Sequence, residues 1–303
     1  MAEFSARRAP ADGILLIDKP AGLTSHDVVA HIRRRLRPAV DKAGHAGTLD
    51  PFATGLLLVV VGRATKIARF FVDLPKEYDC TLRFGVASDT GDRTGTLTQT
   101  GRATTLAAVR RALPRFLGTI QQRVPMTSAV KVDGERLYKK AHRGEVVETP
   151  VKEVSIHAIE PLEFDEATQR LHCRIACSKG TYVRQLASDI GEAVGAGAHL
   201  EQLSRTAIGE FRLERAQPLA AFEEAVEAQG GPAPGIPGLL APGTALSFLP
   251  SLEISAAQVV AVRNGTRLPG AAAEPIRLTH RGQLVAVYGP AGTGPELKPI
   301  VLF

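Results

Sequence analysis

The central feature of this 303-residue chain is Gly44-His45-Ala46-Gly47-Thr48-Leu49-Asp50-Pro51-Phe52-Ala53-Thr54-Gly55, which leads directly into an apolar run, Leu56 to Val61. The glycines allow the backbone to approach a ligand closely, and the following proline pushes Asp50 toward an extended conformation. The apolar run has the length and composition of a strand buried on both faces. Composition alone favours a structural Asx turn before that strand.

Strand and helix patterns surround this stretch without a regular alternation. A short strand at 13–17 precedes a helix that Thr24 or Ser25 can cap, with apolar residues spaced four apart. The other expected strands are 78–86, a pair within 119–132, 151–160, 170–177 and 198–211. The other expected helices are 63–71, 104–113 (capped by Thr104), 135–142, 181–194 and 219–228. This order predicts an α+β fold with a mixed, largely antiparallel sheet flanked by helices.

The sequence divides after residue 228. Residues 1–228 are predicted to form the main domain, and the Gly- and Pro-rich residues 229–250 a linker. Residues 251–303 show a short helix near 256–262 and strands at 275–280, 283–288 and 298–303. A small β-rich domain is therefore expected at the C-terminal end.

Composition excludes several classes of protein. Hydrophobic residues make up 44% and charged residues 22%, which excludes global disorder. No apolar run approaches the ~20 residues that a membrane span needs, and no signal-peptide core is visible, so a cytoplasmic protein is expected. The net charge of +6 favours a polyanionic partner. Aromatic residues are only 5%, which argues against broad stacking platforms for single strands.

The sequence predicts no metal or cofactor site. The eight histidines are scattered, and the three cysteines do not form a disulfide framework. Cys173 and Cys177 alternate with Leu171 and Ile175 as on one buried face of a strand. Motifs for nucleotide phosphates and for a nucleophilic serine are absent. The run from Asp89 to Asp92 lacks the spacing of a calcium loop and indicates a turn.

The central stretch belongs to an ordered series of motifs. The others lie at residues 13–25, 62–66, 76–78, 125–134, 178–184 and 203–209. In order and spacing, across about residues 13–212, they closely resemble the bacterial tRNA pseudouridine-55 synthases, the TruB family of pseudouridine synthases. The C-terminal residues resemble, more weakly, the small PUA-like RNA-binding domain of that family.

The resemblance implies a pseudouridine synthase catalytic domain that acts on one uridine in the T loop of tRNA. The N-glycosidic bond breaks, the base turns, and carbon 5 joins the ribose. The resemblance implies no cofactor and no metal. It implies tRNA, through its T stem-loop, as the partner of a monomer that needs no other protein.

Three residues match the catalytic positions of the family. Asp50 matches the catalytic aspartate, which could attack C1′, stabilise an oxocarbenium-like state or take the 2′ proton. Arg184 matches the arginine that pairs with this aspartate, and Tyr78 matches the aromatic residue that stacks on the target base. Without the motifs, Arg184 would be a helix-surface arginine and Tyr78 a core aromatic residue of a strand.

Four further residues are candidates for substrate binding. His45 matches a residue beside the flipped nucleotide, and Leu203 an apolar residue of the base pocket. Lys19 and Lys66 are expected RNA contacts without a defined role. Two departures from the family pattern, Thr127 in place of a frequent tyrosine and His142 in place of a frequent arginine, leave details of the RNA contact open.

Basic side chains on two predicted helices are candidate contacts to the RNA backbone, with ordinary solvated surface as the alternative. They are Arg33, Arg34, Arg35, Arg37, Lys139, Lys140 and Arg143. Two other functions remain open: a guide-dependent synthase acting on another RNA, and a non-catalytic protein that binds or folds RNA. The chain has no long tail for partner proteins, which disfavours the first, and the Asp50, Tyr78 and Arg184 set disfavours the second.

Overall fold

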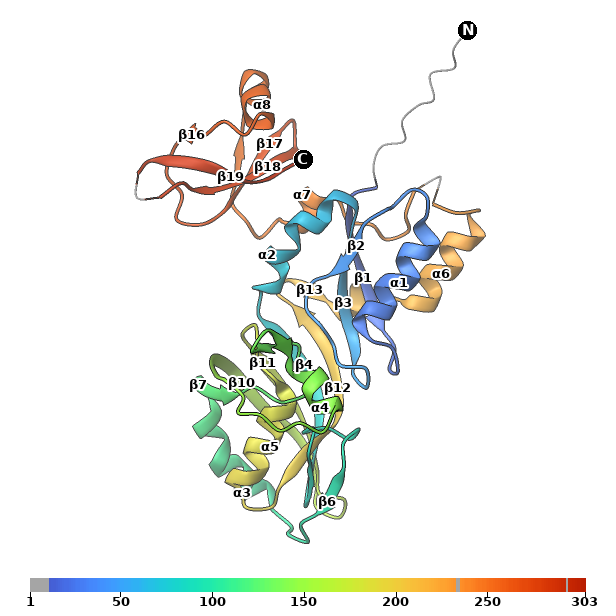
Figure 1. Cartoon of the computed structure of the whole chain (residues 1–303), viewed down its shortest axis with the longest axis vertical. Coiled ribbons are helices and arrows are strands. Elements are labelled where there is room, and N and C mark those ends of the chain that lie inside the picture. Colours follow the sequence, from blue (N-terminus) through green and yellow to red (C-terminus); the bar gives the residue numbers. More distant parts are fainter. Residues whose placement is uncertain (1–10, 233–234, 293) are drawn as a thin grey trace.

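A long mixed sheet forms the centre of the computed structural model, which describes residues 11–232, 235–292 and 294–303 (Figure 1). In the described residues it has ten strands, ordered β14-β1-β3-β12-β4-β11-β10-β7, with β2 on β3 and β13 on β12. Their bounds are β1 (Gly13–Lys19), β2 (Ala43–His45), β3 (Thr54–Val61), β4 (Lys76–Phe84), β7 (Gly118–Arg123), β10 (Val151–Asp165), β11 (Arg170–Cys177), β12 (Ala198–Ile208), β13 (Phe211–Arg212) and β14 (Gln217–Pro218). Only the pairs β1/β14 and β3/β12 are parallel. The predicted α+β class and largely antiparallel sheet are confirmed.

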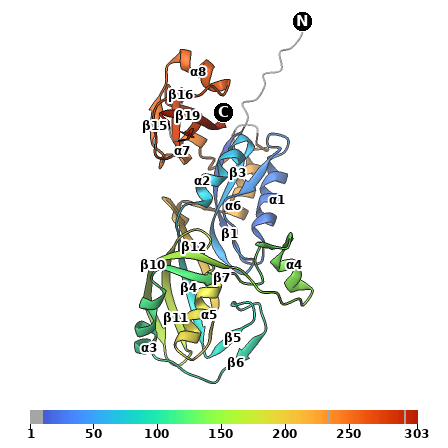
Figure 2. The same ribbon diagram turned by 60° about the vertical axis from the view of Figure 1, so that its left-hand side comes forward.

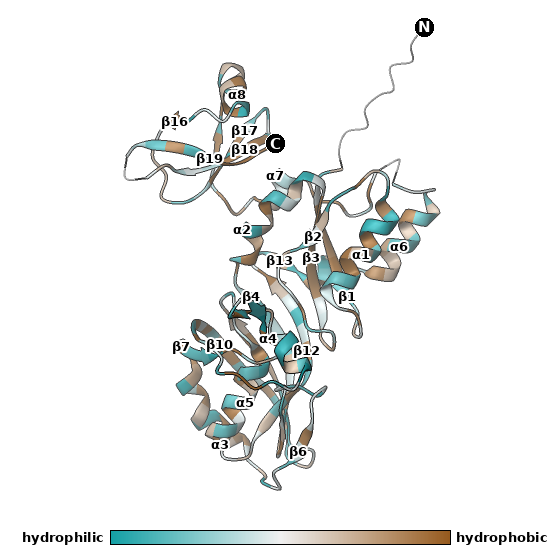
Figure 3. Cartoon of the chain, viewed as in Figure 1, coloured by the Kyte–Doolittle hydropathy of each residue, from teal (hydrophilic) through white to brown (hydrophobic). Residues whose placement is uncertain are grey.

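Strand β3 is buried on both faces, as its apolar sequence predicts. On one face, Leu57 and Val59 pack against the helices α1 (Ser25–Leu36) and α6 (Leu219–Ala228), which lie side by side in Figure 1. On the other face, Leu56 and Leu58 pack under α2 (Ala68–Val72). Figure 3 shows the corresponding hydrophobic colouring of β3.

Helix α1 begins where its capping residues predict. The Thr24 side chain accepts from the Asp27 backbone N–H, and the Asp27 carboxylate accepts from the Thr24 backbone N–H. Thr24 is therefore the cap, and Ser25 is free for another contact.

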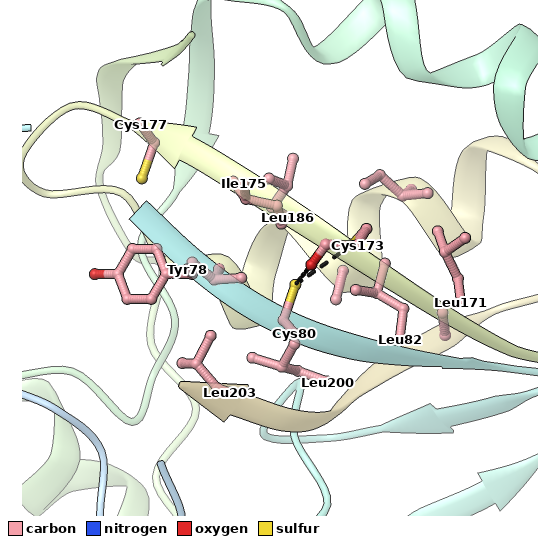
Figure 4. Packing of buried hydrophobic residues seen from close by; sticks show 14 of the residues in the cluster. Tyr78, Cys80, Leu82, Leu171, Cys173, Ile175, Cys177, Leu186, Leu200 and Leu203 are labelled. Atoms are coloured by element: carbon pink, nitrogen blue, oxygen red, sulfur yellow. Dashed lines mark hydrogen bonds between the residues drawn. The ribbon is translucent and has the colours of Figure 1, made fainter. Parts of the chain in front are cut away.

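The other half of the sheet is covered by α3 (Leu106–Ala112) and α5 (Val183–Ala193). Cys173 and Cys177 lie on one buried face of β11, as predicted, and the Cys173 Sγ lies 3.4 Å from the Cys80 Sγ (Figure 4). The cap of α3 is Thr105 rather than the expected Thr104: the Thr105 hydroxyl accepts from the Ala108 N–H at 3.2 Å, whereas the backbone N–H and carbonyl of Thr104 pair with the Gln169 side chain before the helix begins.

Two hairpins leave the large sheet. One consists of β5 (Val86–Ser88) and β6 (Leu97–Gln99), joined by the predicted turn around Asp92. The other lies in residues 124–150 and contains β8 (Lys131–Val132), β9 (Glu135–Arg136) and α4 (Leu137–His142). The region 119–132 contains two strands, β7 and β8, but they do not pair with each other as expected: β7 pairs with β10 in the large sheet and β8 with β9. Figure 2 shows α4 projecting from the body of the molecule.

The C-terminal residues form a second sheet with its own apolar cluster. Its order is β15-β17-β18-β19-β16, and one helix packs on it. The elements are β15 (Ser251–Glu253), α8 (Ala256–Arg263), β16 (Leu268–Pro269), β17 (Ile276–His280), β18 (Gln283–Pro290) and β19 (Glu296–Leu302). None of the helices in the described residues is long and apolar enough to cross a bilayer.

The segment between the two sheets is not a free linker along its whole length. It contains the short helix α7 (Pro242–Ala245), and Leu240 bridges to Ile14 of β1. Leu246 and Leu249 are buried with α2 and with Val287 and Val301 of the second sheet. The two sheets are therefore packed through a shared apolar cluster.

Replacing Gly55 with alanine should destabilise the fold strongly. Gly55 has a φ of +100°, and a Cβ there would lie 2.4 Å from the Arg205 carbonyl oxygen and 2.6 Å from the Arg205 nitrogen. We expect a loss of about 3 kcal/mol or more in the free energy of unfolding, measured by denaturant titration.

Gly101→Ala is the matched control, because Gly101 also has positive φ (+68°), but a Cβ at that position would have no atom within 4 Å. It should cost about 1 kcal/mol. Equal losses for the two variants would show that backbone conformation, not the close approach to β12, sets the requirement at Gly55.

Candidate active site

The loop between β2 and β3 carries Asp50 and is held from beneath by α1 and β1. The Ser25 hydroxyl, 1% exposed, accepts from the Leu49 N–H at 2.8 Å and donates to the Leu49 carbonyl at 3.1 Å. The Gly22 N–H donates to the Pro51 carbonyl at 2.8 Å. The backbone is thereby fixed on both sides of Asp50.

A buried arginine of β12 holds the same loop from the other side. The Arg205 side chain donates to the carbonyls of Leu56 (2.8 Å), Gly47 (3.1 Å) and Thr48 (3.3 Å). The residue is 1% exposed, and in the described residues its hydrogen bonds go to backbone carbonyls. Each such bond from a charged group contributes about 1.5–3 kcal/mol, so Arg205 fixes the loop firmly to the sheet.

The Asp50 carboxylate forms a two-point ion pair with Arg184, at the beginning of α5. Arg184 Nε lies 2.7 Å from Oδ2, and Nη2 donates to Oδ1 at 3.3 Å. The Arg184 side chain is buried, whereas that of Asp50 is 32% exposed and therefore open to a ligand. Burial raises the pKa of Asp50, while the positive charge of Arg184 opposes the rise.

Two residues near Arg184 were not predicted as part of the site. Asp92 lies in the turn between β5 and β6, and its buried Oδ2 is 3.5 Å from Arg184 Nη1. The hydroxyl of Thr127 accepts a hydrogen bond from the same Nη1. The sequence around Asp92 indicated only a turn, and that of Thr127 only a departure from a motif, so neither gave a signal of contact with Arg184.

Tyr78 and Leu203 lie on neighbouring strands, in the apolar cluster that also contains Leu49 beside Asp50 and Val183 beside Arg184. Leu203 of β12 pairs in register with Cys80 of β4, and Tyr78 pairs with Arg205. Figure 4 shows Tyr78 and Leu203 at one end of the apolar cluster, with the phenol oxygen pointing away from Cys80. Burial raises the pKa of Tyr78, and the nearby charge of Arg205 opposes the rise. The neutral phenol therefore predominates in the free protein.

His45 ends β2 at the rim of the same loop. Its Nδ1 is buried and, in the described residues, has no hydrogen-bond partner. Burial, followed by the charge of Arg205, lowers the pKa of His45. The imidazole is therefore neutral near pH 7 and leaves one polar atom for a ligand.

The two lysines predicted to contact RNA occupy different places. Lys19 is completely buried, contrary to expectation for an RNA contact. It is the last residue of β1, which runs further than predicted, and its Nζ donates to the carbonyls of Pro20 (2.8 Å), Leu23 (2.7 Å) and Pro51 (3.4 Å). Burial lowers its pKa to about 8. Lys19 supports the Asp50 loop from within.

Lys66 is exposed in the 3-10 helix η1 (Gly62–Ile67) beyond the far end of β3, and its Nζ donates to the Leu302 carbonyl of the second sheet at 3.4 Å. It is not brought together with Asp50. The described residues contain no group of three or more His, Cys, Asp or Glu side chains placed to hold a metal ion.

Comparison with known families matches most of the large sheet. Residues 33–183 match the N-terminal domain of the TruB family of pseudouridylate synthases. Residues 184–234 match the C-terminal domain of tRNA pseudouridylate synthase B. The first match contains Asp50 and Tyr78, and the second contains Arg184 and Leu203.

Similar proteins cover nearly the whole chain. The tRNA pseudouridine synthase B of Xylella fastidiosa is 44% identical over 271 residues, 88% of this chain and 86% of that protein. That of Aromatoleum aromaticum is 42% identical over 296 residues, 96% of this chain and 93% of that protein.

Solved structures share the fold. An H/ACA ribonucleoprotein bound to a substrate RNA containing 2′-deoxyuridine contains a chain with a TM-score of 0.73 and 24% identity, covering 96% of this chain and 84% of that chain. A Cbf5–Nop10–Gar1 complex contains one with a TM-score of 0.72 and 26% identity, covering 96% and 83%. From both family matches and from relatives above 40% identity along most of its length, the chain belongs to the TruB family of pseudouridylate synthases.

Proposed function

We propose that this chain is a tRNA pseudouridine synthase, an isomerase that converts uridine 55 in the T loop of tRNA to pseudouridine. The observation that carries this function is the ion pair between Asp50 and Arg184 in a chain of this family, with the carboxylate still partly exposed. The paired arginine orients the carboxylate and opposes the rise in its pKa that burial causes.

Asp50 is the residue that acts on the ribose. The N1–C1′ bond of the uridine breaks, the uracil rotates, and a C5–C1′ bond forms; C5 then loses its proton and N1 gains one, so atoms and charge balance. An ionised carboxylate beside C1′ can attack that carbon, stabilise its positive charge or remove the 2′ proton. All three roles require the ionised form.

Tyr78, Leu203 and His45 surround the place of the base. The target nucleotide must leave its stack to reach a carboxylate at this depth. We infer that Tyr78 stacks on the flipped uracil and that its phenol helps to move the C5 proton. Leu203 provides an apolar contact on the neighbouring strand, and the free Nδ1 of His45 contacts a nucleotide at the rim.

The RNA backbone lies across exposed arginines and lysines. Arg33 and Arg37 are exposed and form no ion pair with a carboxylate in the described part of the chain. In contrast, Arg35 pairs with Glu223 and Glu227, and Arg143 pairs with Glu135 and Glu145. We infer that the C-terminal end of α1 is the freer of the two basic surfaces.

The enzyme acts as a monomer in the cytoplasm and needs no protein partner, cofactor or metal. Residues 251–303 serve as a PUA-like domain that contacts the RNA outside the T loop, and Lys66 lies at the junction with this domain.

Asp50→Asn should abolish the reaction without unfolding the protein. The assay is tritium release from a tRNA transcript labelled at uridine C5, with sequencing of the product at position 55. We expect release by the wild type and none above background from the variant, because an amide cannot carry the negative charge.

Two outcomes would overturn parts of this function. Tight tRNA binding without release by the folded wild type would indicate a binding protein, and equal release by both proteins would show that Asp50 is not the essential carboxylate.

Replacing Arg184 should move the acid limb of the pH–rate profile. Because Arg184 lowers the pKa of Asp50, its loss lets the carboxyl stay protonated to higher pH. In Arg184→Gln the limb should therefore move upward by about 1 pH unit or more, beyond any uniform loss of rate. Arg184→Lys retains the charge and should shift it less. Single-turnover rates across the acidic and neutral range measure this, and an unmoved limb would exclude Asp50 as the titrating group.

Neutralising the end of α1 should weaken the salt dependence of tRNA binding. In the triple variant Arg33→Gln, Arg34→Gln, Arg37→Gln, the slope of log affinity against log salt should shrink by about 0.7–0.9 for each phosphate that the variant no longer neutralises. The control is Arg110→Gln, Arg111→Gln on α3, both exposed, which removes two charges where the α1 variant removes three. An equal change per charge removed in the two variants would mean that only overall charge matters.

A further inference from the structure

Thr127 lies outside the predicted site and touches the ion pair between Arg184 and Asp50. Its hydroxyl accepts from Arg184 Nη1, and its backbone carbonyl accepts from Nη2 at 3.3 Å. Nη1 also donates to the Thr90 carbonyl at 3.1 Å. Both terminal nitrogens of the arginine are therefore held by the same residue, while Nε faces Asp50.

Thr127 belongs to residues 124–150, which leave the sheet after β7 and return at β10. The base of this segment is closed by the Val124 N–H, which donates to the Pro150 carbonyl at 3.0 Å. Its outer part is bonded to residues close to Thr127. The Leu137 N–H donates to the Val130 carbonyl at 2.8 Å, and the Tyr138 N–H donates to the Ser128 carbonyl at 3.0 Å. The position of Thr127 is therefore connected to the position of α4 through backbone hydrogen bonds.

The outer part of the segment is also the part that carries positive charge. Helix α4 and its end carry Lys139 and Arg143 at the surface, with Lys140 largely buried beside Asp133. Residues 124–150 thus carry basic side chains in their outer part and contact Arg184 through Thr127.

We propose that Thr127 is a positioning residue that makes the orientation of Arg184 toward Asp50 depend on the place of residues 124–150. The guanidinium meets the carboxylate at two points, Nε and Nη2, and this orientation is kept only when the remaining nitrogen, Nη1, is also held. The Thr127 hydroxyl completes that set of acceptors when the segment lies as it does here. This inference rests on the proposed isomerase function, because its effect is read in the rate of isomerisation.

The hydroxyl is tested by Thr127→Val and Thr127→Ser. Valine keeps the shape and removes the acceptor, and its single-turnover rate should fall about tenfold or more, as expected for a hydrogen bond to a charged group. The KM for tRNA should change less than twofold, and serine should restore most of the rate. Thr119→Val, on exposed β7, is the matched control and should behave as wild type.

The dependence on the segment is tested by a double-mutant cycle with Leu137→Ala. Leu137 is completely buried at the beginning of α4, so its truncation loosens the outer part of the segment. Leu137→Ala should lower the rate in the presence of Thr127 and add little to Thr127→Val. Thermal melting of each variant shows that the protein as a whole remains folded.

The outcomes separate this inference from the function itself. If the wild type forms no pseudouridine, the proposed function fails before Thr127 is tested. If the wild type is active and Thr127→Val matches it, or serine and valine lose rate equally, the hydroxyl does not position Arg184. Additive effects of Leu137→Ala and Thr127→Val would show that the segment acts by another route.

Discussion

The buried guanidinium of Arg205 is the contact on which the site depends. An arginine at 1% exposure costs several kcal/mol in lost hydration, and here backbone carbonyls of the Asp50 loop and of β3 replace the water. The same strand, β12, runs between β3 and β4 and so brings the loop next to Tyr78. Gly55 is needed where the two backbones approach most closely. The loop that carries the Asp50 carboxylate is thus held in place by the buried positive charge of Arg205.

The charged side chains around the Asp50 loop differ in how far they are exposed. Arg205 and Lys19 lie beneath it and donate to carbonyls, whereas Arg184 lies beside Asp50 and faces its carboxylate. Asp92 partly balances Arg184 from the buried side. Asp50 remains partly open to solvent, with Arg184 paired to it from the buried side. This order of burial fixes the orientation of the carboxylate and leaves it accessible.

Much of this could be predicted because it depends on local pattern. The apolar run of β3, the alternation of β11 and the cap of α1 follow from residues close in sequence, and the motifs pointed to Asp50, Tyr78 and Arg184. What escaped prediction depends on contacts between distant residues. Lys19 reads as a surface lysine until the Pro51 carbonyl is placed above it. Asp92 reads as a turn residue until α5 brings Arg184 against it. A sequence shows which apolar residues are buried, but which polar residues are buried depends on the packing of distant segments.

The apolar cluster shared by the two sheets has a consequence for how the chain can be divided. Leu246 and Leu249 lie between β3 and α2 on one side and Val287 and Val301 on the other. A fragment that stops at residue 250 would leave this face of the large sheet open to water, and apolar surface of that kind promotes association between molecules. The smaller sheet thus covers part of the apolar interior of the larger one. Shortened versions of the protein would therefore lose solubility, because they expose side chains that Val287 and Val301 cover in the whole chain.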